Sequence, residues 1–365
     1  MYKNIYLDAP SVGALEKDYL NKAISAGYVS TAGGYVSEFE KKIAEYLKVE
    51  KAVSTQSGTA ALHISLLELG IGRGDEVIVP ALTFVATVNP IMYVGARPVF
   101  VDIDRQTWNI DSKKIEAAIT YRTKAIIPVH LYGNPCNMDK IEKIAQKHKL
   151  YVIEDATESL GAKYKGRYTG TFGDFGCFSF NGNKIITTGG GGMVVGKSFE
   201  KIDHIKFLIN QAKSLDNSAY HSEVGFNYRM TNIEAALGLA QIRRLKYFLA
   251  KKRKFKNIYE EELRPIAGIC FQREEMRAES SFWLTCVIVD NRSAGFLQSK
   301  LLEQGIPARR IFMPLMEFPF CQRGNRGDFS NSYYLYERGL CLPSSTLNKE
   351  NDIFNVCKVI KNAIK

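Results

Sequence analysis

The sequence predicts an α/β protein with a mainly parallel central sheet and a smaller C-terminal α+β domain. Short apolar runs alternate with helical patterns between about residues 50 and 200, and a long helical stretch follows at 232–263. The composition then shifts to a shorter, second set of strand and helix patterns. Alternating strands and helices imply right-handed crossovers and a sheet covered on both faces. We therefore expect a large α/β domain over residues 1–245 and a small domain over 246–365.

Each expected element rests on its own pattern. Ala60, His63 and Leu67 recur at helical spacing, as do Leu62 and Leu66, and Gly70 stops the helix that they form. Along the chain, the expected helices cover residues 59–69, 84–94, 138–148, 232–263, 293–304, 333–340 and 350–364. The expected strands cover residues 51–54, 76–79, 98–103, 124–130, 150–154, 176–180, 192–195 and 281–289. Ligands of such sheets lie beyond the carboxyl ends of the strands, so the chemistry is sought there.

The composition excludes several classes of protein. With 365 residues, 45% of them hydrophobic and 24% charged, the chain is globular rather than disordered. No apolar run approaches the roughly 20 residues of a membrane span, and the first residues do not read as a signal peptide. The seven cysteines are widely spread, without the spacing of a metal site. We expect a cytoplasmic protein with no metal and no membrane contact.

The net charge of +11, from 49 basic and 38 acidic residues, has three interpretations. It is a basic surface without further role, a contribution to binding an anionic small molecule, or a nucleic-acid interface. The basic residues are scattered, and no nucleic-acid reader motif appears. We expect no nucleic-acid partner.

The segment Ser57-Gly58-Thr59 lies where a strand ends and a helix begins. Free backbone N–H groups and the positive end of the helix dipole favour an anion there, and the two hydroxyls add donors. A plain helix cap explains the same residue types, because Ser and Thr stabilise helix N-termini without any ligand. This segment alone leaves both interpretations open.

Asp155 follows an apolar strand directly and is expected at the carboxyl end of the sheet. A buried carboxylate there needs a cationic partner or strong donors. A protonated heterocyclic nitrogen suits it, since opposite charges 4 Å apart attract by ~4 kcal/mol at an effective dielectric constant of 20. A capping role for the acid pair at 154–155 is the alternative.

Lys184 stands between two expected strands, in a turn rich in Gly, Asn and Thr. A partly desolvated lysine that faces a cavity has a lowered pKa and becomes nucleophilic. An ordinary loop lysine is the alternative if the segment is taken alone. Three features follow one another along the chain: an anion cradle, an acid at a strand end and a lysine beyond a strand. Together they suit an enzyme that uses pyridoxal 5'-phosphate.

At this point the sequence resembles a known family, the DegT/DnrJ/EryC1/StrS sugar aminotransferases, which have the fold of aspartate aminotransferase (fold type I of pyridoxal phosphate enzymes). The resemblance covers nearly the whole chain. It is carried by residues 27–40 (GYVSTAGGYVSEFE), 57–62 (SGTAAL), 74–89 (GDEVIVPALTFVATVN), 97–104, 128–133, 154–161, 171–194 and 225–238 (GFNYRMTNIEAALG).

The resemblance implies a role for particular residues. Lys184 matches the lysine that forms a Schiff base with the cofactor and then moves the proton, and Asp155 matches the acid paired with the pyridine nitrogen. Phe84 matches the aromatic that stacks on the cofactor ring. The phosphate contacts match Gly58, Thr59 and Ser179, beside Ser57.

Four further residues are implied by the same resemblance. Asn227 matches a residue that reaches the phosphate of the neighbouring subunit, so the resemblance implies a homodimer with shared active sites. Ser30, Thr31 and Arg229 are expected near the substrate.

Two departures from the family pattern indicate which branch of the family this sequence resembles. Many members carry Gln or His where this chain has Glu158, and an acidic residue where it has Gly190. Glu158 with the glycine run is similar to the branch that makes UDP-linked 4-amino sugars for bacillosamine, and residues 7–20 (LDAPSVGALEKDYL) resemble enzymes of legionaminic acid synthesis. Glu158 is expected at the phenolic oxygen of the cofactor, where a carboxylate needs a proton or another donor.

The implied activity moves an amino group from L-glutamate, released as 2-oxoglutarate, to C4 of a UDP-linked 4-keto-6-deoxy-N-acetylhexosamine for a bacterial surface glycan such as lipopolysaccharide. A 3-ketosugar enzyme, an enzyme for a GDP- or dTDP-linked 4-ketosugar and a non-catalytic pyridoxal phosphate-binding homologue are the alternatives. An amino-acid-directed enzyme of the same fold is a further rival. Family dehydratases carry His in place of the lysine, so Lys184 argues against that activity.

Overall fold

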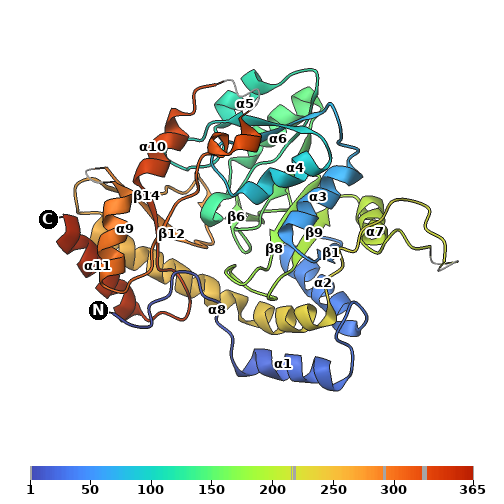
Figure 1. The fold of residues 1–365 in the computed structure, drawn as a ribbon, viewed down its shortest axis with the longest axis horizontal. Helices are drawn as coiled ribbons and strands as arrows, with labels where there is room; N and C mark the ends of the chain where they lie inside the picture. Colours follow the sequence, from blue (N-terminus) through green and yellow to red (C-terminus); the bar gives the residue numbers. More distant parts are fainter. Residues whose placement is uncertain (1, 215, 217–218, 291–292, 323–326, 365) are drawn as a thin grey trace.

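The computed structural model describes residues 2–214, 216, 219–290, 293–322 and 327–364. A seven-stranded sheet forms the centre of this part of the chain, in the order β1-β9-β8-β5-β4-β2-β3 (Figure 1). The pairs β2–β3, β2–β4, β4–β5 and β5–β8 are parallel, whereas β9 is antiparallel to both its neighbours. These strands are β1 (Ala52–Thr55), β2 (Glu76–Pro80), β3 (Arg97–Val101), β4 (Thr123–Ile126), β5 (Tyr151–Asp155), β8 (Phe175–Ser179) and β9 (Gly192–Gly196). The predicted mainly parallel sheet is confirmed.

Helices cover both faces of this sheet. Successive side chains of a strand point to opposite faces, and the strands carry apolar side chains on both, so each face needs a covering layer. Val77 and Val79 pack in one apolar cluster while Ile78, between them, packs in another. The helices of this part are α1 (Ala14–Ser25), α2 (Gly34–Leu47), α3 (Gly58–Glu68), α4 (Asn89–Tyr93), α5 (Ser112–Ala118), α6 (Met138–His148) and α7 (Phe199–Leu208). Short 3-10 turns are η1 (Val85–Thr87) and η2 (Leu131–Gly133).

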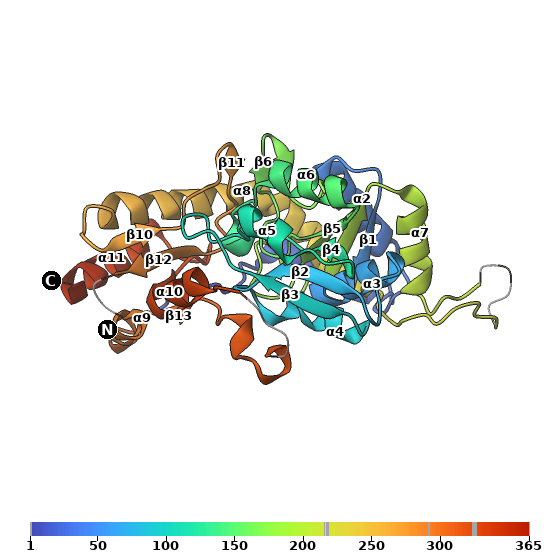
Figure 2. The ribbon, with the colours of Figure 1, turned by 90° about the horizontal axis from the view of Figure 1, so that it is seen from above.

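A second, antiparallel sheet has the order β10-β12-β14-β13. Its elements are β10 (Ile269–Phe271), β12 (Thr285–Val289), β13 (Arg309–Arg310), β14 (Gly339–Leu342), α9 (Ala294–Glu303), α10 (Ser330–Arg338), α11 (Glu350–Ile364), η3 (Leu315–Glu317) and η4 (Pro319–Cys321). A small sheet of β6 (Lys163–Tyr164), β7 (Arg167–Tyr168) and β11 (Ala278–Glu279) joins segments far apart in the sequence. Both chain ends lie at the end of the molecule that carries α9 and α11 (Figure 2).

The long helix α8 (Asn232–Leu263) runs from one sheet to the other. Its first turns pack Ala235 and Leu239 into the apolar cluster of the central sheet, and its last turns pack Tyr259 and Leu263 against the second sheet. Thr231 begins the helix, because its hydroxyl accepts from the N–H of Glu234, whose carboxylate accepts in return. The proposed domain boundary at 245/246 lies within this helix.

The structure differs from the predictions in these four elements. Residues 84–94 form η1 and then α4 instead of one helix, since Pro90 lacks the N–H that a continuous helix needs there. The strand expected at 124–130 ends at Ile126, and that expected at 281–289 begins at Thr285. The helix expected at 333–340 ends at Arg338, where the chain enters β14.

Candidate active site

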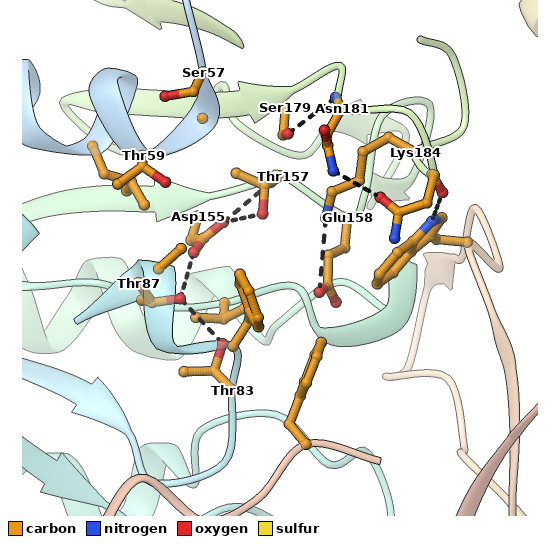
Figure 3. Close-up of a pocket in the computed structure, with 18 of the residues that line it drawn as sticks. Ser57, Thr59, Thr83, Thr87, Asp155, Thr157, Glu158, Ser179, Asn181 and Lys184 are labelled. Carbon is orange, nitrogen blue, oxygen red and sulfur yellow. Dashed lines mark hydrogen bonds and ion pairs between the residues drawn. The ribbon is translucent and has the colours of Figure 1, made fainter. Parts of the chain in front are cut away.

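A cavity of about 430 Å³ opens at the carboxyl ends of the parallel strands (Figure 3). This volume lies within the ~300–1,000 Å³ typical of small-molecule sites. Eight of the nine residues expected at the cofactor line it, and they are Ser57, Gly58, Thr59, Phe84, Asp155, Glu158, Ser179 and Lys184. The other lining residues are Leu62, Thr83, Ala86, Thr87, Val129, Thr157, Asn181, Asn183, Gly190, Gly191, Trp283, Arg309 and Phe312.

The start of α3 forms one wall. Ser57 caps this helix, and its Oγ accepts from the N–H of Ala60 at 3.1 Å. The N–H groups of Gly58 and Thr59 precede the first one that the helix turn itself satisfies, that of Ala61. The glycine run packs on this turn: a Cβ on Gly192 would lie 2.5 Å from the carbonyl of Ser57. The sequence left a helix cap and an anion site as alternatives for this segment. The structure allows both, because Ser57 caps the helix while the N–H groups of Gly58 and Thr59 have no partner within it.

Asp155 ends β5 on the second wall and is buried. One carboxylate oxygen accepts from the Thr87 hydroxyl at 2.7 Å, and the other accepts from the hydroxyl and N–H of Thr157 at 2.7 and 3.2 Å. Three donors thus fix the carboxylate at the cavity wall. A carboxylate has about four acceptor positions, so it can take one further donor from a ligand.

Lys184 lies in the turn between β8 and β9, close to Trp283. Its Nζ lies 4.1 Å from the centroid of the Trp283 ring, and the indole N–H donates to the carbonyl of Asn183 at 2.6 Å. Burial lowers the pKa of Lys184, because the charged form loses its hydration. The lowered pKa makes the amine a stronger candidate nucleophile.

Glu158 lies on the same side of the cavity and is buried. Its Oε1 lies 4.0 Å from Nζ of Lys184, and its Oε2 accepts from the N–H of Tyr132 at 2.7 Å. Burial raises the pKa of Glu158 to about 7, although the positive charge of Lys184 opposes the shift.

Aromatic rings line the mouth of the cavity. The ring of Phe84 is 53% exposed and lies 5.6 Å from that of Phe312, which stacks on Tyr132 at 5.2 Å. An exposed ring beside a cavity can stack on a planar ligand. The position of Phe84 therefore fits the role that the sequence assigns to it.

Three of the lining residues that the sequence patterns did not predict are Thr157, Trp283 and Arg309. Thr157 lies within the motif at 154–161, whereas Trp283 and Arg309 come from the C-terminal part, where no motif marks them. Arg309 brings a second basic side chain to the cavity, held 3.3 Å from the carboxylate of Asp8. Only the tertiary structure brings Trp283 and Arg309 to this cavity.

The remaining predicted residues lie outside this cavity. Thr31 and Arg229 line a separate cavity of about 240 Å³, and the carbonyl of Ser30 accepts from the N–H of Asn232. Asn227 pairs with Asn210 in an isolated bridge. A single chain does not bring these four residues to Lys184.

The cavity fits pyridoxal 5'-phosphate. The group needs an anion cradle, a carboxylate for its pyridine nitrogen and a lysine amine for its aldehyde carbon. The N–H groups of Gly58 and Thr59 in the first turn of α3, the carboxylate of Asp155 and the amine of Lys184 supply all three in one space. In the described part of the chain, no three or more His, Cys, Asp or Glu side chains group in a way that could hold a metal ion. No helix of the described residues is long and apolar enough to cross a membrane.

The whole chain is similar to known proteins. The model of the DegT/DnrJ/EryC1/StrS aminotransferase family matches residues 10–361. The chain is 39% identical to the GDP-perosamine synthase of Escherichia coli O157:H7, over 98% of each chain. It is 36% identical to a UDP-N-acetyl-3-dehydro-alpha-D-glucosamine 3-aminotransferase of Acidithiobacillus ferrooxidans, over 89% of this chain and 87% of that one.

Solved structures share the fold. A sugar aminotransferase of Streptococcus pneumoniae, Spr1654, described as putative and solved in its PLP form, superposes with a TM-score of 0.94 and 27% identity. The match covers 99% of this chain and 98% of that one.

Proposed function

The chain belongs to the DegT/DnrJ/EryC1/StrS aminotransferase family and is a pyridoxal phosphate-dependent sugar aminotransferase, and we propose that it aminates C4 of a nucleotide-linked 4-keto-6-deoxy-hexose. The amino donor is L-glutamate, which leaves as 2-oxoglutarate. The observation that carries the proposal is the convergence of Lys184, Asp155 and the start of α3 on one cavity. The product serves a bacterial surface glycan.

Two classes of nucleotide sugar compete as the acceptor. Glu158 with the glycine run favours a UDP-linked N-acetylhexosamine, by resemblance to the bacillosamine branch. The 39% identity to a GDP-perosamine synthase favours a GDP-linked sugar. The 3-aminotransferase relative supports C3 as the alternative position on the sugar.

The residues of the cavity divide the work. Bound pyridoxal phosphate supplies an electron sink for the carbon that loses its proton. The start of α3, with Ser179, holds the phosphate, and Asp155 holds the proton of the ring nitrogen. The amine of Lys184 would hold the group at its aldehyde carbon and would move a proton at the reacting carbon. Trp283 covers Lys184 and keeps water from its amine.

We also propose a cytoplasmic homodimer in which each chain completes the site of the other. Supporting this, Asn227 and Arg229 lie outside the cavity of their own chain, and the ring of Phe84 is left half exposed. In the dimer, Asn227 reaches the phosphate of the second site, and Ser30, Thr31 and Arg229 lie near its sugar substrate. Sedimentation of the purified protein should give twice the mass of 41.0 kDa.

The test uses the colour of the bound cofactor. Purified protein with pyridoxal phosphate should absorb visible light, bleach with L-glutamate and recover its colour with a 4-ketosugar nucleotide. A panel of UDP-, GDP- and dTDP-linked 4-ketosugars identifies the acceptor. A 3-ketosugar nucleotide in the same panel tests the alternative position of amination. A Lys184→Ala protein that still turned over a ketosugar with glutamate would refute the assignment. Bleaching without recovery on any ketosugar would instead favour an amino-acid-directed enzyme, and no bleaching would favour a non-catalytic homologue.

A further inference from the structure

Lys184 and Glu158 form a buried pair that no hydrogen bond joins directly. The amine and Oε1 of Glu158 are 4.0 Å apart, and the two side chains are 13% and 3% exposed. The N–H of Tyr132 holds Oε2 at 2.7 Å, which leaves Oε1 as the oxygen that faces the amine (Figure 3). The pair therefore has one fixed oxygen and one oxygen open to a proton.

Burial acts on both partners in the direction that favours a neutral pair. It raises the pKa of Glu158 and lowers the pKa of Lys184, so the proton affinities of the acid and the ammonium move toward each other. The other titratable or charged groups that act on the pair are Asp8, Tyr132, Asp155, Cys286 and Arg309. Among these, Arg309 opposes the charge of Lys184, whereas Asp155 opposes that of Glu158.

We propose that Glu158 is a catalytic residue that exchanges a proton with Lys184, taking it from the ammonium and returning it later in the cycle. The inference rests on the proposed function, because it concerns the same lysine. In the forward step an Nζ–H bond of Lys184 breaks and an Oε1–H bond of Glu158 forms. No electrons are transferred and no other reagent is consumed.

The geometry permits this exchange with a small movement. A hydrogen bond needs about 3 Å between heavy atoms, and the flexible four-carbon stem of Lys184 can bring the separation of 4.0 Å down to that distance. Glu158 stays in place, because Tyr132 holds its second oxygen. The neutral amine left behind is the form that attacks a carbonyl carbon or removes a proton.

The first test measures the protonation of Glu158 in the cofactor-free protein by infrared difference spectroscopy. We expect a carboxylic acid band that titrates near pH 7 in wild type and is missing in Glu158→Gln. In Lys184→Met this titration should move to higher pH, because the cation that favours the carboxylate is lost. The surface variant Asp139→Asn should leave the band unchanged. A Glu158 carboxylate that stays ionised from pH 5 to 9 would overturn the proposal, whatever the outcome of the substrate panel.

The second test separates proton exchange from a merely structural role. With L-glutamate as the only substrate, the Glu158→Gln protein should bleach about 10- to 100-fold more slowly than wild type, with an unchanged KM. This loss lies near or below the ~10²–10⁴-fold rate contribution of a general acid or base. Glu158→Asp should recover part of the rate. The pH at which the cofactor-free protein captures pyridoxal phosphate should shift to lower values in Glu158→Gln. Identical pH profiles of capture in both proteins would contradict the exchange, and wild-type protein that failed to bleach would contradict the proposed function instead.

Discussion

The amine of Lys184 lies 4.1 Å from the centroid of the Trp283 ring, although the two residues are about a hundred positions apart in the chain. Lys184 lies between two strands of the central sheet, and Trp283 lies just before a strand of the second sheet. The indole N–H also donates to the backbone of Asn183, the residue before the lysine. Trp283 thus positions the lysine from the C-terminal part of the chain.

Replacing Trp283 should slow the chemistry without abolishing cofactor binding. A cation–π contact contributes ~0.5–2 kcal/mol, so we expect Trp283→Leu to slow bleaching by glutamate by about 10-fold. Trp283→Phe keeps a ring but loses the indole donor, and its rate should lie between those of wild type and Trp283→Leu. Stopped-flow absorbance measures all three. Equal rates for wild type and Trp283→Leu would show that the ring has no role.

Asp155→Asn should lose most of the activity while keeping the fold. A carboxylate 4 Å from a pyridinium contributes ~4 kcal/mol at an effective dielectric constant of 20, which corresponds to about 1,000-fold in rate. Thr157→Val removes one donor to Asp155 and should cost only ~1 kcal/mol, or about 5-fold. Transamination rates, with circular dichroism as a check on folding, decide this. A wild-type rate in Asp155→Asn would exclude its role at the ring nitrogen.

Gly192→Ala should weaken the binding of pyridoxal phosphate. The added Cβ would meet backbone atoms of Ser57 at 2.5 Å and of Gly58 at 2.7 Å, so the anion cradle must move. We expect at least about 10-fold weaker binding, since a 1.4 kcal/mol loss suffices for that. Gly182→Ala, in the turn that precedes β9, meets no atom within 4 Å and serves as the matched control. Equilibrium titration of the cofactor-free proteins gives both constants.

Lys252 should make the free energy of unfolding depend on pH in the alkaline range. Its buried ammonium donates to the carbonyls of Trp283 and Ser344, and burial lowers its pKa from 10.5 to about 8. Between pH 8 and 10.5 the unfolded chain holds this proton more tightly than the folded one. Stability therefore rises with pH through that window, by up to about 3 kcal/mol from this group.

The measurement compares wild type with Lys252→Met by urea unfolding from pH 7 to 10.5. The free energy of unfolding of wild type, minus that of the variant, should increase as the pH rises. Lys251→Met, one position earlier on the same helix, should show the pH dependence of wild type. A constant difference between wild type and Lys252→Met would mean that Lys252 does not titrate in this range.

Arg309→Gln should raise the KM for L-glutamate. Arg309 is the second basic side chain at the cavity, and a hydrogen bond to a charged group contributes ~1.5–3 kcal/mol, or about 10- to 100-fold. Its neighbour Arg310 stacks on Tyr336 instead, so Arg310→Gln is the control. Steady-state kinetics with each substrate varied would contradict this role if only the KM for the sugar nucleotide changed.

Local patterns predicted much of the fold. The bounds of α6, α8 and α11 agree with the expected helices, because long amphipathic periods and caps such as Thr231 are local signals. The expected helix at 84–94 was wrong, since Pro90 outweighs the apolar pattern there. The antiparallel direction of β9 has no signal in its own residues, as it depends on which strands lie beside it.

By itself, the sequence determined the family and the cofactor, and it predicted that Ser57, Asp155 and Lys184 would meet, because each lies at or beyond the carboxyl end of a strand and these ends share one edge of the sheet. It did not determine the partners of those residues. Trp283 over Lys184, Arg309 beside Asp8 and the separation of 4.0 Å between Lys184 and Glu158 arise where the second sheet and the N-terminal segment close on the first. Only the tertiary structure decides such contacts, since burial and pKa depend on neighbours that are distant in the chain.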